Sequence, residues 1–155
     1  MKNFCLISAL LILLLSSEKT MAQKTSKPEY QTAIGVKIFP FALSLKTKVG
    51  VRGKNSMEFL GYFKDGFRLT GLYEFEGKLN TEGNLKWYLG FGGHAGFSDK
   101  SHGGDVKLGA DGIIGLDYKF KNLPLNLSLD WQPALGIGED NSFTNWGGLG
   151  VRFTL

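Results

Sequence analysis

Apolar and polar residues alternate along the chain from residue 30 to its end, and clusters of turn residues interrupt the alternation. A two-residue repeat is typical of β-strands whose two faces differ, and no stretch keeps the 3.6-residue repeat of a helix. The pattern predicts eight strands of about nine to thirteen residues, which suits a tilted membrane crossing. They begin near Tyr30, Ala42, Met57, Phe67, Leu85, Val106, Leu125 and Phe143. The pattern is weakest over 57–63, where Leu60 and Tyr62 break the alternation.

The two faces of the predicted strands differ in bulk. One face carries Trp, Phe, Tyr and Leu in nearly every strand, and the other carries charged residues and glycines. These glycines are Gly35, Gly90, Gly92, Gly96, Gly109, Gly115, Gly148 and Gly150. Because an eight-stranded barrel is only wide enough inside for side chains to fill it, the bulky apolar face is expected to point outward, toward lipid. A soluble lipocalin-like carrier, with the apolar face inside, is the alternative.

Aromatic residues on the apolar face fall at two levels, with aliphatic residues between them. Amphipathic rings favour the two membrane–water interfaces, so this order fits a lipid-facing surface. The aromatic residues expected at the interfaces include Tyr30, Trp87, Tyr118, Trp131 and Phe143. The even strand count places both chain ends in the periplasm. We therefore predict an all-β fold, a closed eight-stranded antiparallel up-and-down transmembrane β-barrel.

The first residues of the chain have the pattern of a secretory signal peptide. Lys2 provides a positive start, residues 4–15 form an apolar run, and Thr20-Met21-Ala22 offers small residues for cleavage. A run of this length is too short to span a bilayer of about 30 Å. We predict a signal peptide over 1–22, a periplasmic segment over 23–29 and the barrel over 30–155, with export to the outer membrane.

Composition excludes several classes of function. The chain has 155 residues, 22 of them glycine, and a net charge of +4. That length suits one domain, and so small and scattered a charge excess does not favour a nucleic-acid partner. Removal of the signal peptide would remove Cys5, the one cysteine, so we expect no disulfide, thiol nucleophile or cysteine metal site. No metal and no cofactor are predicted.

The last eight residues, Gly148-Leu149-Gly150-Val151-Arg152-Phe153-Thr154-Leu155, form an alternating terminal strand. With the signal peptide and the amphipathic strands, it makes the chain resemble small bacterial outer-membrane barrels of the OmpA/OmpX type. The resemblance implies outer-membrane lipids as surroundings and the barrel-assembly machinery as a partner during biogenesis. It implies an assembly signal at Leu149, Val151, Phe153 and Leu155, where Leu155 replaces the family's usual terminal aromatic residue. A plain buried strand is the other interpretation.

The inward face carries charges of both signs. The predicted ion-pair network comprises Lys37, Arg68, Glu74, Lys86, Asp111, Asp117, Asp130 and Arg152. Lys46, Lys48, Lys107, Lys119, Glu58 and Glu76 share that face. Opposite charges in one narrow interior are expected to satisfy one another, which predicts a plugged polar lumen. A selective pore is the alternative.

Residue types found in catalytic sites cluster around one predicted outer hairpin. His94, Ser98 and His102 lie there with Asp99, Ser101 and Asp105, and such residues can form an acyl-transfer triad. Outer-membrane barrels of the PagL and PagP type hydrolyse or transfer lipid A acyl chains. The closely spaced His-x-Ser pair that we associate with the deacylase is missing here, and a metal site would have irregular spacing. We expect a solvated loop without catalysis.

The sequence thus predicts an outer-membrane barrel with a structural or envelope-interaction role and no enzymatic activity. A lipid-modifying barrel enzyme is the first alternative, and the periplasmic carrier is the second. An envelope partner is a further possibility, because small residues such as Gly71, Gly93 and Ala110 fall on the outward face. Sheet curvature is the other explanation for these small residues.

Overall fold

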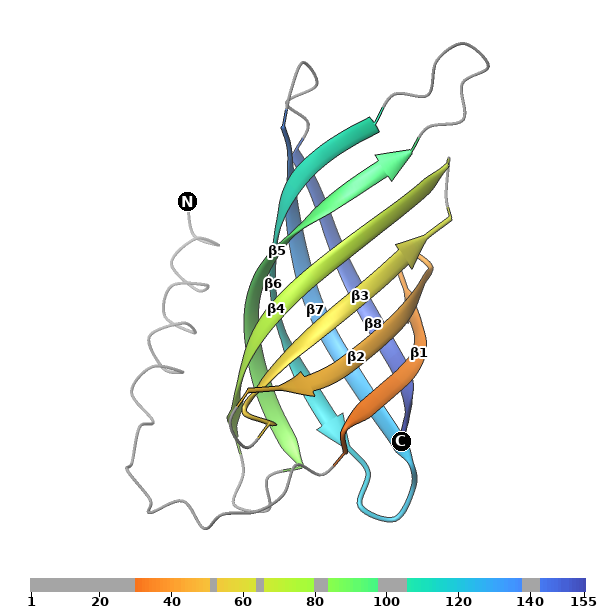
Figure 1. Ribbon diagram of the computed structural model, residues 1–155. Coiled ribbons are helices and arrows are strands. Elements are labelled where there is room, and N and C mark those ends of the chain that lie inside the picture. The colour runs from red at the N-terminus through yellow and green to blue at the C-terminus, as the bar shows by residue number, and fades with distance from the viewer. Residues whose placement is uncertain (1–29, 51–52, 64–65, 80–83, 98–105, 138–142) are drawn as a thin grey trace, which may run out of the picture.

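A computed structural model describes residues 30–50, 53–63, 66–79, 84–97, 106–137 and 143–155. The predicted signal peptide, the 23–29 segment, Ser98 and His102 lie outside the described residues. The described residues form a closed barrel in which each strand is antiparallel to its sequence neighbours and β1 pairs with β8 (Figure 1). The strands are β1 (Thr32–Ile38), β2 (Ala42–Val49), β3 (Asn55–Tyr62), β4 (Phe67–Lys78), β5 (Leu85–Phe97), β6 (Val106–Lys119), β7 (Leu125–Ile137) and β8 (Phe143–Thr154). Within this part of the chain, no helix has the length and apolar character needed to cross a membrane.

The predicted fold class, a closed eight-stranded antiparallel barrel, is confirmed. Six strands begin at the predicted residue, whereas β1 starts at Thr32 and β3 at Asn55. The predicted strand length of about nine to thirteen residues is too long for β1 to β3, which contain 7 or 8 residues. Strands β4 to β8 contain 12 to 14 residues. Pro40 has no N–H for the sheet, so pairing between β1 and β2 ends at the turn that contains it. This edge of the barrel consequently stands lower than the β5–β6 edge (Figure 1).

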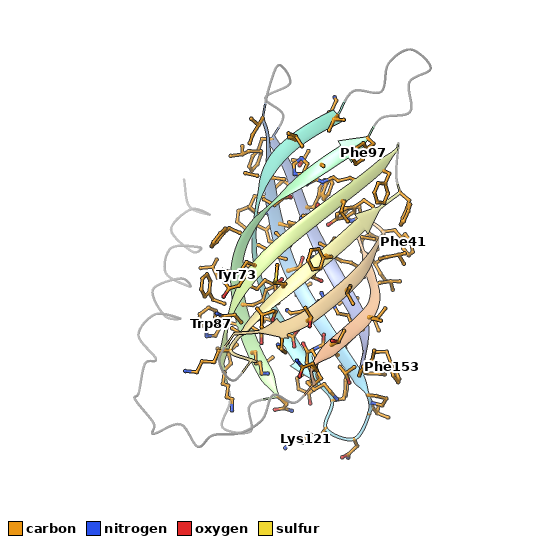
Figure 2. The ribbon with its side chains drawn as sticks, viewed as in Figure 1. Phe41, Tyr73, Trp87, Phe97, Lys121 and Phe153 are labelled. Carbon is orange, nitrogen blue, oxygen red and sulfur yellow. The ribbon has the colours of Figure 1, made fainter. Side chains whose placement is uncertain are left out.

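The outer surface of the barrel is apolar. Leu89 is 52% exposed, Phe91 62% and Leu129 61%, and many other large apolar side chains on the same face are similarly exposed. Figure 2 shows Trp87 and Phe153 projecting outward near the end that holds the C-terminus, and Phe41 and Phe97 projecting near the opposite end. The structure therefore places the bulky apolar face outside, as volume predicts.

Glycines on the inward face allow the strands and side chains to come close together. A Cβ atom added to Gly92 would lie 1.9 Å from the carbonyl oxygen of Gly71, and one added to Gly35 would lie 2.0 Å from that of Val151. On the outward face, a Cβ atom at Gly71 would meet only the Phe59 ring, 3.7 Å away. Of the eight interior glycines named above, all except Gly96 are thus required by packing, in agreement with the narrow lumen expected for eight strands.

Candidate functional site in the barrel interior

The half of the interior near Tyr30 and the C-terminus is filled by charged side chains in contact with one another. The ammonium of Lys46 lies 2.6 Å from Glu74 Oε2 and 3.6 Å from Asp117 Oδ2, and Lys48 pairs with Glu76. The Lys46 and Glu74 side chains are 0% exposed. Buried charges persist in a protein only when they are paired and hydrogen-bonded. These contacts therefore fill the interior with ion pairs between β2, β4 and β6.

Arg152 on β8 is the centre of a second cluster. Its Nε donates to Ser44 Oγ at 2.7 Å, one terminal nitrogen donates to Asn126 Oδ1 at 3.2 Å and Ser128 Oγ at 2.9 Å, and the other donates to Glu58. Arg152 has no exposed surface. A guanidinium offers donors in a fixed fork, so these contacts tie together four strands of the barrel.

Lys37 and Asp130 form a third group of charges in the interior. Lys37 Nζ is 2.9 Å from Asp130 Oδ1, and the hydroxyl of Tyr88 donates to Asp130 Oδ2 at 2.7 Å. The ammonium of Lys46 lies 4.2 Å from the centre of the Tyr88 ring, so this ring joins the two groups of charges.

Tyr30 departs from the predicted position at an outer interface. Its side chain is 5% exposed and lies inside, with Lys48 Nζ 4.7 Å from the ring centre. Burial raises the pKa of its phenol well above the ordinary value. The prediction assumed that the alternation of β1 extends to residue 30, whereas β1 begins at Thr32 and the chain before it turns the ring inward.

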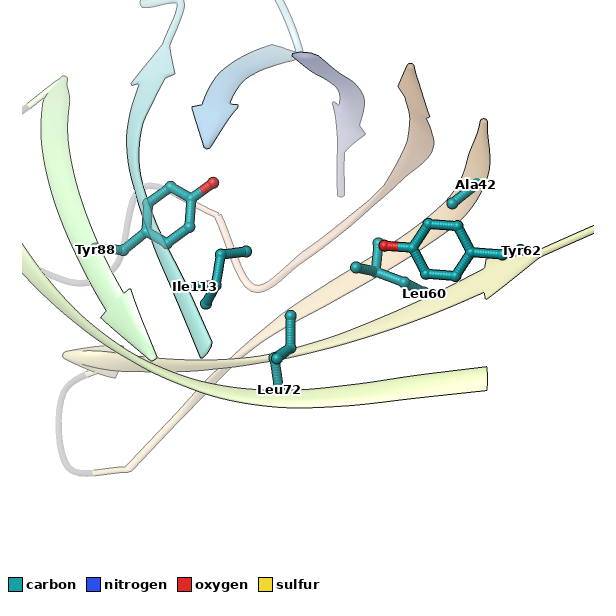
Figure 3. Close-up of a cluster of buried hydrophobic side chains, with 6 residues drawn as sticks. All are labelled: Ala42, Leu60, Tyr62, Leu72, Tyr88 and Ile113. Carbon is teal, nitrogen blue, oxygen red and sulfur yellow. The ribbon is translucent and has the colours of Figure 1, made fainter. Parts of the chain in front are cut away.

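An apolar layer crosses the interior next to the ion pairs, on the side away from the C-terminus. Ala42, Leu60, Tyr62, Leu72, Tyr88 and Ile113 form one buried cluster, and Trp146 packs against it (Figure 3). Leu60 is 0% exposed, and Leu72 and Ile113 are each 2% exposed. Alternation within single strands does not reveal this layer, and the break in alternation at Leu60 and Tyr62 is the signal for it in the sequence.

A cluster of charged and polar side chains lies between the apolar layer and the end of the barrel that is farthest from the C-terminus. Asp111 is its centre, with Arg68 2.6 Å from Oδ1, His94 Nδ1 2.6 Å from Oδ2, and Gln132 donating to Oδ1 at 3.1 Å. The Arg68 guanidinium lies 4.2 Å from the Trp146 ring centre, which adds a cation–π contact. The side chain of Arg68 is 15% exposed and that of Asp111 is 0% exposed. The cluster therefore reaches the entrance of the lumen through Arg68.

His94 is held by its contact with Asp111. Its Nδ1 faces Asp111, and its ring occupies the space that a side chain at Gly109 would need, since a Cβ there would lie 2.2 Å from the ring. A carboxylate on Nδ1 orients an imidazole as it does in an acyl-transfer triad. Ser98 and His102, the other members of the candidate triad, lie outside the described residues. In the described segments, no three His, Cys, Asp or Glu residues are grouped to hold a metal ion.

The remaining predicted residues lie on the faces expected from the alternation. Lys86 is half-buried and lies opposite Asp117 across the β5–β6 pair. Trp87 covers Gly77 on the outer face, and the Trp131 indole donates to Asn145. The other expected interface aromatics, Tyr118 and Phe143, are 36% and 59% exposed. On β8, the residues proposed as the assembly signal, Leu149, Val151, Phe153 and Leu155, follow the outward face, and all except the half-buried Val151 are exposed.

Comparisons with known proteins give one structural similarity. No protein-family model matches the chain, and no curated protein matches it. Among solved structures, the barrel is similar to the crystal structure of Neisserial surface protein A, with a TM-score of 0.49 and 13% sequence identity. The similarity covers 80% of this chain and 93% of that one.

Proposed function

We propose that this chain is an integral protein of the outer membrane of a diderm bacterium, with a closed interior and a structural or envelope-interaction role. The observation that carries the proposal is the distribution of polarity across the wall of the barrel. Charged side chains such as Lys46, Glu58 and Arg152 are 0% exposed inside, and large apolar side chains cover the outside. Such a distribution is unfavourable in water and is the one that a lipid environment stabilises.

The backbone of the barrel supports the same environment. Each strand is paired on both sides, and β1 closes the sheet against β8. In hydrocarbon no water can bind free N–H and C=O groups, so a closed barrel is one of only two backbone arrangements that cross a bilayer. The short strands β1 to β3 are flanked by exposed Phe39, Phe41 and Phe63, which fit the interfaces on that side.

A closed interior is the second part of the proposal. The ion pairs of Lys46, Lys37 and Arg152 fill the part of the lumen near the C-terminus. The layer of Leu60, Leu72 and Ile113 lies on the other side of them. An ion that entered from the Arg68 end would lose water among these apolar side chains. The hydroxyls of Tyr62 and Tyr88 in the same layer are already hydrogen-bonded to Gln132 and Asp130. We therefore infer that the barrel does not conduct ions freely.

The proposal includes no catalysis. The Nδ1 atom of His94 lies 2.6 Å from Asp111 Oδ2, so its position is explained by this contact alone. A lipid-modifying enzyme that uses His94 with Ser98 and His102 is the alternative from another class. Lipid A analysis of a His94 variant, described in the Discussion, separates the two.

Gel mobility tests the membrane barrel most directly. Protein from washed outer membranes is run in SDS with and without boiling. Because all strand edges are paired, a membrane barrel resists cold SDS and is expected to change its apparent mass only after heating. Recovery in the soluble fraction with no shift would contradict the proposal and favour the periplasmic carrier, whose aromatic residues would line a ligand cavity.

A further inference from the structure

We propose that a hollow at the β6–β7 turn binds the headgroup phosphate of an anionic phospholipid, an inference that rests on the proposed membrane location. The hollow has a volume of about 380 Å³. It is lined by Asn84, Tyr118, Phe120, Lys121, Asn122 and Leu123. Its wall thus combines two aromatic rings and a leucine with one cation and two amides, the combination that suits a molecule with a charged head and an apolar tail.

The turn that forms the hollow is held in one shape. Lys119 Nζ donates to the carbonyl oxygens of Phe120 and Leu123, each at 2.7 Å. The backbone N–H of Phe120 donates to Leu125 at 3.0 Å, and that of Lys119 donates to Asn84 at 2.8 Å. A binding site formed before the ligand arrives avoids the entropy cost of ordering a loop. The Lys119 charge also remains next to the hollow, because both of its partners are neutral carbonyl groups.

The apolar part of the hollow lies where lipid tails begin. Tyr118 and Phe120 are on the outward side of β6 and just beyond it, and their rings meet edge to face with centres 5.0 Å apart. Leu123 lies in the turn and is 52% exposed. An exposed leucine beside an aromatic pair at the end of a lipid-facing strand offers a surface for an acyl chain.

The charged part lies at the level of headgroups. Lys121 is exposed and lies beyond the last residue of β6, at the end of the barrel shown at the bottom of Figure 2. The C-terminus is at the same end (Figure 1), and short turns at this end face the periplasm in bacterial outer-membrane barrels. The leaflet on that side of the outer membrane consists of phospholipid. The proposed ligand is therefore a glycerophospholipid of this leaflet.

Among the residues that the structure describes at this end, the exposed charged side chains favour an anionic lipid. The exposed side chains of Lys54, Lys78 and Lys121 lie there, whereas Glu76 and Asp117 are buried in ion pairs of the lumen. Each lysine close to a membrane surface attracts anionic lipid by about 1 kcal/mol, so the rim as a whole prefers a negative leaflet. The rim attracts anionic lipid in general, and the hollow gives one phosphate a defined binding position.

Native mass spectrometry of the detergent-purified, full-length mature protein tests this site. The protein is titrated with phosphatidylglycerol, and bound lipid is counted for the wild type and for Lys121→Gln. We expect binding at least about tenfold weaker for Lys121→Gln, the loss of one hydrogen bond between charged groups. Lys54→Gln is the matched control, because Lys54 is another exposed lysine in a turn at the same end but does not line the hollow. It is expected to weaken binding by at most about fivefold, the diffuse attraction of one lysine. Leu123→Ser, which keeps the charge, is also expected to weaken binding.

Three results would overturn the inference. Unchanged binding by both Lys121→Gln and Leu123→Ser would remove the site, and equal weakening by Lys121→Gln and Lys54→Gln would show diffuse attraction only. Displacement of the lipid by an excess of inorganic phosphate would make it a site for free anions. The heat-dependent gel shift is measured on every variant, so that a folded membrane barrel without lipid preference contradicts only this inference and leaves the proposed function standing.

Discussion

Arg152 on β8 and Glu58 on β3 form an ion pair across the interior of the barrel, between strands that are not neighbours in the sheet. The residues are 94 positions apart in the chain, and neither side chain is exposed. Ser44 donates to the same Glu58 oxygen at 2.7 Å, and it also accepts from Arg152. The pair therefore connects the last strand to the first half of the barrel through the lumen rather than through the sheet.

The first prediction concerns this pair. Arg152→Met leaves Glu58 buried without its main cation, and breaking a buried pair in this way costs about 3–5 kcal/mol of unfolding free energy. Urea unfolding in lipid vesicles, followed by tryptophan fluorescence, measures the loss. Lys54→Gln, at an exposed position, is expected to change the unfolding free energy by less than about 0.5 kcal/mol. A loss for Arg152→Met as small as that of the control would mean that the interior pair contributes little.

The second prediction compares two glycines on adjacent rows of the β4–β5 pair. In Gly92→Ala the new methyl group would lie 1.9 Å from the Gly71 carbonyl oxygen, so the backbone has to move. We expect a loss of about 1–3 kcal/mol, typical of overpacking. Gly71→Ala meets only the Phe59 ring at 3.7 Å and is expected to be neutral or slightly stabilising. Equal effects of the two substitutions in the same unfolding assay would refute the assignment of inward and outward faces.

The third prediction concerns the apolar layer. Leu72→Ala combined with Ile113→Ala removes most of the side-chain volume from two of its fully buried members, and water and ions gain a path past it. We expect discrete conductance steps in planar bilayers for this variant and none for the wild type. Each substitution also costs about 2–5 kcal/mol, so only protein that shows the folded gel band is reconstituted.

A control for the third prediction lies on the outer face of the same strands. Leu69→Ala combined with Ile114→Ala removes similar volume from β4 and β6 but leaves the lumen intact. This variant is expected to remain closed. Conductance by the control, or no conductance by the Leu72→Ala, Ile113→Ala variant, would show that the layer is not the barrier to ions.

The fourth prediction separates a structural barrel from a lipid-modifying enzyme. His94→Ala removes the imidazole that faces Asp111, and with it the base that the candidate triad needs. Because we assign His94 a structural contact with Asp111, the acyl pattern of lipid A in cells that carry the variant is expected to match that of wild-type cells by mass spectrometry. A changed pattern would establish catalysis and make the Ser98–His102 region the next target.

Local alternation was sufficient to predict most of the fold. Strand positions depend only on the two-residue repeat, which each strand carries in its own residues. The choice of the outward face and the glycines of the interior both follow from the narrow radius of eight strands. Trp87, Trp131 and Phe143 accordingly lie on the outer face, as predicted. The prediction for Tyr30 was wrong because alternation holds only inside a strand, and residue 30 precedes β1.

The sequence by itself thus determined that the chain forms a closed barrel with charges inside and apolar residues outside. Only the tertiary structure decided which charges meet, because pairs such as Arg152 with Glu58, or Lys37 with Asp130, depend on the tilt and stagger with which eight strands close. The same holds for the apolar layer. Leu60 and Tyr62 interrupt the pattern of one strand, and they find Leu72 and Ile113 only when the closed sheet brings their inner faces together.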